Sequence, residues 1–382
     1  MIPYGRHSIS EGDISAVTQV LRGEWLTTGP LVEQFEKALE KVVGAPCISV
    51  SSGTAALHSA YAAIGIEPGD EIITPPLTFI ATQATAALLG AKIVFADVKS
   101  DTGNIDPEKV LTSITPRTKA IVAVDYAGHP ADLSELRSIA DKHNLILIED
   151  AAHSIGSYYN GMPVGSIADI TTFSFFPTKN ITTGEGGAVA STNPDLLRKA
   201  RLFSRQGLIR NHDEMNLRID GPWHQEVQNF GLNYRLPDIL CALGVSQLSR
   251  LDEFKSIRNE IFDCYWTALS DIEELVLPTR YPYVDPMWHL YPLRVPISRR
   301  RELYLRLREA GIGVQVNYLP AHMHPVFLKE GFREGDFPVS EEFYRGEISL
   351  PMFSDKGILD ENFFEGLRGI LLQFFPKRNA SA

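Results

Sequence analysis

The stretch that decides the fold and the chemistry of this chain is TTFSFFPTKNITTGEGG, residues 171–187. It begins as a β-rich run, places one lysine, Lys179, shortly after Phe175, Phe176 and Pro177, and ends in a glycine-rich tail. Aromatic surroundings desolvate a lysine and lower its pKa, and the neutral amine is the form that attacks a carbonyl. The alternative is a surface lysine whose aliphatic stem lies over an aromatic patch. Both interpretations fit the stretch taken alone.

Apolar strands alternate with amphipathic helices on both sides of this stretch. We expect strands at 47–50, 71–74, 93–98, 120–125, 145–148 and 188–190, and helices at 55–64, 79–89, 107–114, 133–143 and 195–203. Short apolar strands between amphipathic helices predict an α/β fold, with a mainly parallel sheet that has helices on both faces. Ligands of such sheets bind at the carboxyl ends of the strands.

The remaining segments predict how the chain is divided. Residues 204–230 are polar and irregular, which is typical of a long functional or intersubunit loop. One long helix is expected from about 236 to 269. The last third predicts strands at 290–296 and 313–319, a basic helix at 299–310 and closing helices. We therefore expect a large domain over 1–250 and a smaller α+β domain over 251–382.

Composition narrows the class of protein. The chain has 382 residues, of which 44% are hydrophobic and 22% charged, as in ordinary globular proteins with a large core. A formal net charge of −11 argues against a general nucleic-acid binder. Cys47, Cys241 and Cys264 are too widely spaced to indicate a metal site or a disulfide framework. Without an apolar signal core or an uninterrupted apolar span, we expect a cytoplasmic protein that binds no metal and no membrane.

Two segments next to predicted strands suit a phosphate group. Gly53 and Thr54 open a helix directly after a strand, so that free backbone amides and a hydroxyl form a cradle for an anion. The alternative is ordinary capping of that helix. Ser174 precedes Lys179 by one short turn and lies within reach of the same phosphate from the adjoining strand.

Three further residues suit a planar cofactor. Asp150 follows an apolar strand and can keep a pyridine nitrogen protonated, which makes the ring an electron sink, although it can also be a cap or an ion-pair partner. His153 can donate to a phenolic oxygen of that ring or be a core histidine. Phe79 can stack on the ring or pack in the core. In this order the residues fit pyridoxal phosphate (PLP) held as a Schiff base by Lys179.

The chain resembles the sugar aminotransferase branch of the fold-type-I PLP enzymes, the DegT/DnrJ/EryC1/StrS family, from about residue 2 to about residue 370. The matching segments are SSGTAAL (51–57), TFIAT (78–82), EDAAH (149–153), SFFPTKN (174–180), TTGEGG (182–187) and GLNYRL (231–236). The resemblance implies a seven-stranded, mainly parallel sheet flanked by helices. It also implies a homodimer whose active sites are shared between subunits.

The resemblance assigns a role to each candidate residue. Lys179 forms the Schiff base with PLP and then serves as the acid and base of the proton shift. Asp150 pairs with the pyridinium nitrogen, Phe79 stacks on the ring, and His153 lies near the ring oxygen. The implied phosphate contacts are Gly53, Thr54, Ser174 and, from the neighbouring subunit, Asn233.

The resemblance of two segments to known enzymes indicates which class of sugar the protein acts on. The segment ITTGEG (181–186) is similar to enzymes that aminate C4 of a nucleotide-linked 4-keto-6-deoxy sugar, and Lys179 separates the chain from dehydratase relatives that have histidine there. MIPYGR (1–6) and WLTTGP (25–30) are most similar to a branch that aminates a UDP-linked N-acetylated sugar with L-glutamate as donor. The implied substrate contacts are Tyr4, Trp25, Thr27, Gln315, Asn317 and Tyr318.

Two departures from the family pattern leave the substrate open. Asn317 and Gln206 stand where many relatives have histidine, so the nucleotide (UDP, dTDP or GDP) and the sugar stay undetermined. The alternative functions are a C3 sugar aminotransferase and a non-catalytic protein that binds cofactor or sugar nucleotide.

Overall fold

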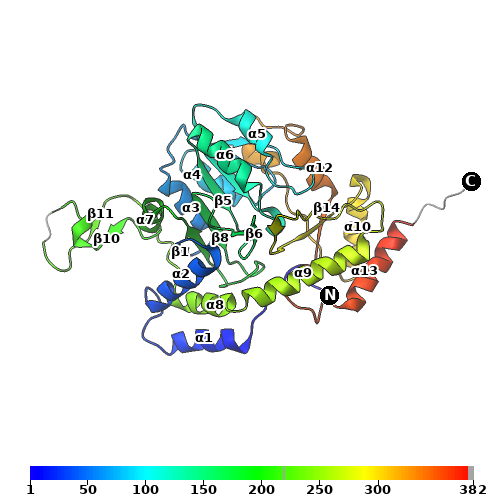
Figure 1. Cartoon of the computed structure of the whole chain (residues 1–382), viewed down its shortest axis with the longest axis horizontal. Helices are drawn as coiled ribbons and strands as arrows, with labels where there is room; N and C mark the ends of the chain where they lie inside the picture. The colour runs from blue at the N-terminus through cyan, green and yellow to red at the C-terminus, as the bar shows by residue number, and fades with distance from the viewer. Residues whose placement is uncertain (218–219, 377–382) are drawn as a thin grey trace, which may run out of the picture.

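A seven-stranded sheet forms the centre of the computed structural model, which describes residues 1–217 and 220–376 (Figure 1). Its strand order is β1-β9-β8-β5-β4-β2-β3. Neighbouring strands pair in parallel except at β9, which runs antiparallel to both β1 and β8. The prediction of a mainly parallel α/β sheet is confirmed. The strands are β1 (Cys47–Val50), β2 (Glu71–Thr74), β3 (Lys92–Phe95), β4 (Thr118–Val124), β5 (Ile146–Asp150), β8 (Ile170–Ser174) and β9 (Gly187–Ala190).

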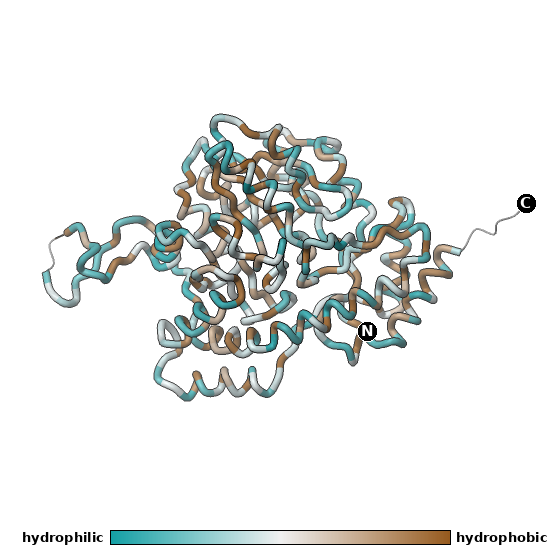
Figure 2. Tube along the Cα trace, in the orientation of Figure 1, coloured by the Kyte–Doolittle hydropathy of each residue, from teal (hydrophilic) through white to brown (hydrophobic). Residues whose placement is uncertain are grey.

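Helices cover both faces of this sheet, which explains why its strands are apolar almost throughout. In β9, Ala188 and Ala190 pack in a cluster with Phe35, whereas Val189 packs on the other face with Ala56 and Ala200. Figure 2 shows the hydrophobic segments gathered in the middle of the molecule. The helices of this part are α1 (Glu11–Leu21), α2 (Pro30–Val43), α3 (Gly53–Ala63), α4 (Ala81–Leu88), α5 (Pro107–Ser113), α6 (Leu133–His143), α7 (Pro194–Phe203) and α8 (Asp238–Leu248).

The C-terminal third has its own hydrophobic cluster around a two-stranded antiparallel sheet. Trp288, Tyr265 and Tyr291 lie fully buried in that cluster, and Ile2 from the N-terminus packs against it. No described helix is long and apolar enough to span a membrane. The elements of this third are α9 (Leu251–Leu269), β13 (Tyr291–Arg294), α10 (Ile297–Glu309), α11 (Pro325–Leu328), α12 (Pro338–Gly346), β14 (Glu347–Leu350) and α13 (Glu361–Phe374).

The structure corrects two predicted elements. The long helix expected from 236 to 269 is two helices, because Arg250 leaves the helical conformation between α8 and α9 and its guanidinium binds Asp13 (2.7 Å). The strand expected at 313–319 does not form. Only Gln315 bridges to Ser349, and the amide of Asn317 donates to a carboxylate rather than to a neighbouring strand.

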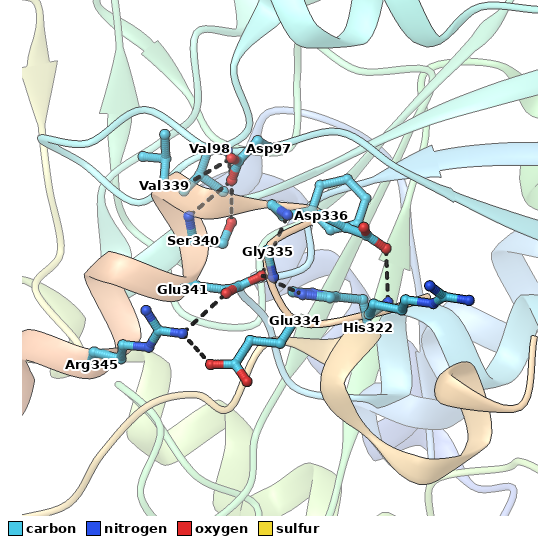
Figure 3. A network of polar contacts seen from close by, with 12 residues as sticks. Asp97, Val98, His322, Glu334, Gly335, Asp336, Val339, Ser340, Glu341 and Arg345 are labelled. Carbon is cyan, nitrogen blue, oxygen red and sulfur yellow. Dashed lines mark hydrogen bonds and ion pairs between the residues drawn. The ribbon is translucent and has the colours of Figure 1, made fainter. Parts of the chain in front are cut away.

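A polar network fastens α12 to the sheet just beyond the end of β3 (Figure 3). Asp97 accepts hydrogen bonds from Val339 N (3.0 Å), Ser340 N (2.9 Å) and Ser340 Oγ (2.6 Å), all in the first turn of α12. Glu341 in the same helix contacts His322 Nε2 at 3.0 Å in a buried pair. The C-terminal third is therefore attached to the sheet through buried charge-assisted hydrogen bonds.

Residues 204–217 and 220–230 form an arm that extends away from the body of the molecule (Figure 1, green). The arm is mainly irregular, as predicted, and contains a short hairpin of β10 (Leu208–Ile209) and β11 (Glu226–Val227). It exposes large apolar side chains: Trp223 is 72% and Phe230 97% exposed. The other short strands are β6 (Tyr158–Tyr159), β7 (Met162–Pro163) and β12 (Val284–Asp285), which pair with one another.

Candidate functional site

Three segments meet at the carboxyl edge of the sheet: the turn from β1 into α3, the end of β5, and the loop from β8 to β9. That loop is closed at its base, where Phe175 N donates to the carbonyl of Gly186 (2.9 Å) and Thr183 N donates to the carbonyl of Phe175 (3.0 Å). Lys179 lies between these two anchors, and its own amide donates to the carbonyl of Phe176 (2.8 Å). These hydrogen bonds hold the backbone of the loop in place and so fix the position of the Lys179 Cα atom.

Lys179 is half-buried, and burial lowers its pKa to about 8, although the Asp150 carboxylate opposes this shift. Phe175 is fully buried beneath the loop, whereas Phe176 is exposed. Because the amine loses its proton well below the usual lysine pKa, a useful fraction of it is nucleophilic near neutral pH.

Asp150 is the last residue of β5, and only 5% of it is exposed. Its carboxylate accepts hydrogen bonds from Thr82 Oγ1 (2.8 Å) and from Ala152 N (3.2 Å). Burial raises the pKa of Asp150, while these hydrogen bonds and the charge of Lys179 counteract the rise. Thr82 was not among the predicted site residues, although it ends the TFIAT segment that carries Phe79.

His153 lies beside a second histidine, His289, which was not among the predicted site residues. Their ring centroids are 4.3 Å apart, and the Nδ1 atom of each is buried without a hydrogen-bond partner among the described residues. Burial lowers the pKa of both well below the usual value, and Lys179 adds to the shift, so both rings are neutral. His153 Nε2 also lies 3.3 Å from the Tyr318 hydroxyl.

Gly53 and Ser174 form a tight pair at the start of α3. A Cβ on Gly53 would lie 2.7 Å from the Cβ of Ser174, which is too close for any other residue type. Ser52 caps α3 by accepting from Ala55 N (3.0 Å), and Thr54 is exposed in the first turn. The free amides of a helix start therefore lie directly against a serine hydroxyl, which is the arrangement that a phosphate requires.

Phe79 is not a core residue. Its ring is 58% exposed, and its centroid lies 6.1 Å from that of Tyr318. Asn317, which directly precedes Tyr318, contacts the N-terminal segment, because Asn317 Nδ2 donates to the Tyr4 hydroxyl (2.6 Å). Tyr4, Asn317 and Tyr318 are therefore connected to the surroundings of His153, and Phe79 offers an open ring face beside them.

Four predicted site residues lie apart from this group. Trp25 and Thr27 are exposed in the segment between α1 and α2, Asn233 is exposed between the arm and α8, and Gln315 is exposed beside Ser349. Among the described residues, no hydrogen bond, ion pair or ring contact joins any of the four to Lys179 or Asp150.

Known proteins of similar sequence show the family to which the chain belongs. The sequence model of the DegT/DnrJ/EryC1/StrS aminotransferase family matches residues 7–358. The chain belongs to this family.

Relatives of known name cover nearly the whole chain. The UDP-4-amino-4,6-dideoxy-N-acetyl-beta-L-altrosamine transaminase of Campylobacter jejuni is 38% identical over 95% of this chain and 95% of its own length. The structure is similar to Helicobacter pylori PseC, an aminotransferase of pseudaminic acid biosynthesis, with a TM-score of 0.91 and 30% identity over 99% of this chain and all of PseC. It is also similar to Streptococcus pneumoniae Spr1654 in its PMP form, with a TM-score of 0.92 and 28% identity over 99% of this chain and all of that one. Spr1654 also has a PLP form.

The protein is therefore an aminotransferase that uses PLP. Its residues fit the cofactor, because the close approach of Gly53 to Ser174 leaves a backbone cradle and Lys179 has a lowered pKa. When bound, PLP supplies the electron sink for the reaction. Asp150 is the buried carboxylate that would face its ring nitrogen.

Proposed function

We propose that the protein transfers the amino group of L-glutamate to C4 of a nucleotide-linked 4-keto-6-deoxy sugar, with a UDP-linked N-acetylated sugar as the favoured substrate. The names of the Campylobacter transaminase and of PseC support a sugar-nucleotide substrate. The segment 181–186 supports amination at C4. The observation that carries the proposal is the electrostatic influence that the buried carboxylate of Asp150 exerts on Lys179, a lysine with a pKa of about 8.

Each residue of the site has a task in this proposal. Lys179, once neutral, takes a proton from the reacting carbon and returns it, which requires a pKa near the working pH. Asp150 holds a proton on the ring nitrogen, and Thr82 keeps its carboxylate in place. His153 stays neutral, so it can donate a hydrogen bond to the ring oxygen. Phe79 covers one face of the ring.

We further propose that the protein works as a homodimer. The arm exposes Trp223 and Phe230, and apolar side chains this exposed commonly mark a protein interface. Asn233, Trp25 and Thr27 are exposed and have no described contact with Lys179, so in this proposal they act at the active site of the second subunit. The neighbouring subunit thus completes each site.

Two further assignments belong to this proposal. Arg250, between α8 and α9, marks the division between a large domain (1–250) and a small domain (251–382). Cys47 and Cys241 are free and buried thiols, which supports a reducing, cytoplasmic setting.

The test is an assay of the holoenzyme with L-glutamate and a panel of 4-keto-6-deoxy sugar nucleotides that differ in the nucleotide and at C2. Mass spectrometry detects the amino sugar, and NMR of the product shows which carbon carries nitrogen. We expect a UDP-linked N-acetylated sugar to be aminated at C4. Nitrogen at C3 would show the alternative specificity. A protein that retains its PLP absorbance with glutamate and aminates no sugar would be a binding protein.

A further inference from the structure

Asp238 is a buried carboxylate that joins two distant segments of the chain. It is the first residue of α8 and is fully buried. Its Oδ2 accepts a hydrogen bond from Gly29 N (2.7 Å), and its Oδ1 accepts one from Leu31 N (3.0 Å). These amides lie at the start of α2, where the N-cap residue Gly29 has no side chain to accept them. Asp238 therefore caps α2 from another helix and fixes the point at which the chain enters α2.

The segment that leads into α2, residues 25–29, packs tightly against this carboxylate. A Cβ on Gly29 would lie 2.5 Å from the Cβ of Trp25 and 2.7 Å from Asp238 Oδ1, so only glycine fits between them. Thr28 has a φ of 55°, in the left-handed region, which turns the chain sharply at this point. Trp25 is nevertheless 56% exposed. Its backbone is thus held in a fixed place while its side chain stays open to contact from outside its own chain.

Asn233 lies on the segment that leads into α8, and hydrogen bonds hold this segment as well. The amides on either side of it, Leu232 N and Tyr234 N, donate to carbonyls at the C-terminal end of α7 (2.7 Å and 2.9 Å). Asn233 itself is exposed, and α8 begins a few residues later at Asp238. Asp238 therefore connects the segment that presents Trp25 with the segment that presents Asn233.

Both segments line one cavity of about 700 Å³. Thr28 and Gly29 border it from the first segment, and Arg235 and Leu236 border it from the second. Because side chains do not fill this space, the hydrogen bonds that Asp238 accepts are the direct polar link between the segments among the described residues.

We propose that Asp238 is a positioning residue that sets segment 25–29 relative to Asn233, so that both reach the active site of the second subunit together. This inference rests on the proposed function, in which Trp25, Thr27 and Asn233 act across the dimer. Asp238 touches neither sugar nor cofactor in this role and acts through the backbone of Gly29. A displacement of about 1 Å in a substrate-positioning group can lower a rate by about 100-fold.

A purely structural role of Asp238 predicts a different result. If Asp238 only caps α2, its loss lowers the stability of the protein but leaves the kinetics of the folded enzyme unchanged. If it positions segment 25–29, its loss weakens binding of the sugar and spares glutamate, because the residues that meet the sugar are displaced while Lys179 and Asp150 stay in place. Urea unfolding measures the first effect, and substrate kinetics measure the second.

The first experiment compares half-saturating concentrations in stopped-flow half-reactions. The PLP form is mixed with L-glutamate, and the PMP form with a UDP-linked N-acetylated 4-keto-6-deoxy sugar. We expect the value for the sugar to rise on the order of 10-fold or more in Asp238→Ala, by less in Asp238→Asn, which keeps one acceptor oxygen, and the value for glutamate to stay unchanged. The control is Asp252→Asn, exposed in the first turn of α9, which should match the wild type for both. An equal rise for both substrates, or a rise for neither, would overturn the positioning role.

Mixed dimers test whether Asp238 acts across the subunit boundary. Asp238→Ala and Lys179→Ala chains with different affinity tags are co-expressed, and the mixed dimer is isolated. One of its two sites combines Lys179 of the first chain with the intact Asp238 of the second, so we expect about half the wild-type rate per dimer and the wild-type half-saturation for the sugar. If Asp238 serves its own subunit, this site keeps the raised half-saturation of Asp238→Ala, and the proposal fails.

A second variant and the wild type separate the possible failures. If Asp238→Ala does not fold, Gly29→Ala takes its place, because the added Cβ displaces segment 25–29 while Asp238 is intact, and it should behave in the same way in mixed dimers. A wild type that is monomeric or aminates no sugar would overturn the proposed function, and this inference with it. A dimeric wild type that aminates the sugar, beside an Asp238→Ala variant with unchanged kinetics, would overturn this inference alone.

Discussion

Two opposing influences act on the pKa of the Lys179 amine. Burial favours the neutral form, whereas the Asp150 carboxylate favours the charged form, and the balance is a pKa of about 8. An unperturbed lysine titrates more than two pH units higher. A pKa near a physiological pH suits the two roles that we propose for the amine, nucleophile at one stage and proton carrier at another.

The rate at which the cofactor-free protein captures PLP should follow this pKa. Only the neutral amine attacks the aldehyde, so the rate should rise with pH and level off above about pH 8. Asp150→Asn removes the influence that raises the pKa of Lys179, so the midpoint should move to lower pH. Formation of the visible band, followed between about pH 6 and pH 10, measures both. A rate that climbs steadily up to pH 10 would contradict the lowered pKa, and Lys179→Ala should form no such band.

The start of α3 and the start of β9 depend on glycine for close contacts. A Cβ on Gly53 would lie 2.7 Å from Ser174 Cβ, and a Cβ on Gly187 would lie 2.4 Å from the carbonyl oxygen of Ser52. The glycine-rich tail of the lysine loop thus packs directly against the start of α3, where we propose that the phosphate binds. The glycines of this tail therefore have a packing role, which is separate from the specificity for C4 of the sugar that we propose for segment 181–186.

Gly53→Ala should weaken PLP binding. Overpacking of this kind costs about 1–3 kcal/mol, which corresponds to roughly 5- to 150-fold in the dissociation constant of PLP. Pyridoxal lacks the phosphate, so its affinity should change less, and fluorescence titration with both compounds measures the difference. Gly366→Ala in α13 is the matched control, because a Cβ there meets no atom. Equal losses for PLP and pyridoxal would argue against a phosphate cradle at Gly53.

The first turn of α12 depends on Asp97. This buried carboxylate accepts three hydrogen bonds from Val339 and Ser340, and a fourth from Val98 N. Asp97→Ala leaves buried donors unsatisfied and should lower the free energy of unfolding by about 1–3 kcal/mol. Urea unfolding measures the change. The exposed Asp195→Ala serves as control and should stay within about 0.5 kcal/mol of the wild type. A midpoint equal to that of this control would show that the network in Figure 3 adds no stability.

The sequence was most informative where an element is defined by its own residues. The predicted bounds of β1, β2 and α6 agree with the structure, because local apolar spacing and flanking turn residues are enough there. The break between α8 and α9 was missed, since the apolar spacing continues across Ser249 and the cause is a distant contact of Arg250 with Asp13. Thr82 and His289 were missed for a similar reason. Nothing in the sequence around them marks a site residue, and only tertiary packing brings Thr82 to Asp150 and His289 to His153.

At the scale of the whole molecule, the arm exposes large apolar side chains that a single chain does not bury. If the arm packs on a second copy, Phe230→Asp should shift the protein toward monomer, because it places a charge where an almost fully exposed ring would be buried. Analytical ultracentrifugation over a range of protein concentrations measures this shift. Leu305→Asp, at a half-exposed position on α10, is the control and should not change the mass. A Phe230→Asp variant that sediments like the wild type would place the interface elsewhere.

The position of β9 in the sheet sets a limit on when the protein can acquire its cofactor. β1 lies at the edge of the sheet, and β9 is its only neighbour among the described strands, with Cys47 opposite Ala190. At roughly 5–20 residues per second, a ribosome needs about 7 to 29 s to proceed from the first of these residues to the second. During that interval the nascent strand that leads into the phosphate cradle has no partner. The growing polypeptide can therefore capture PLP at both its phosphate and its aldehyde only after about half of the chain has been translated.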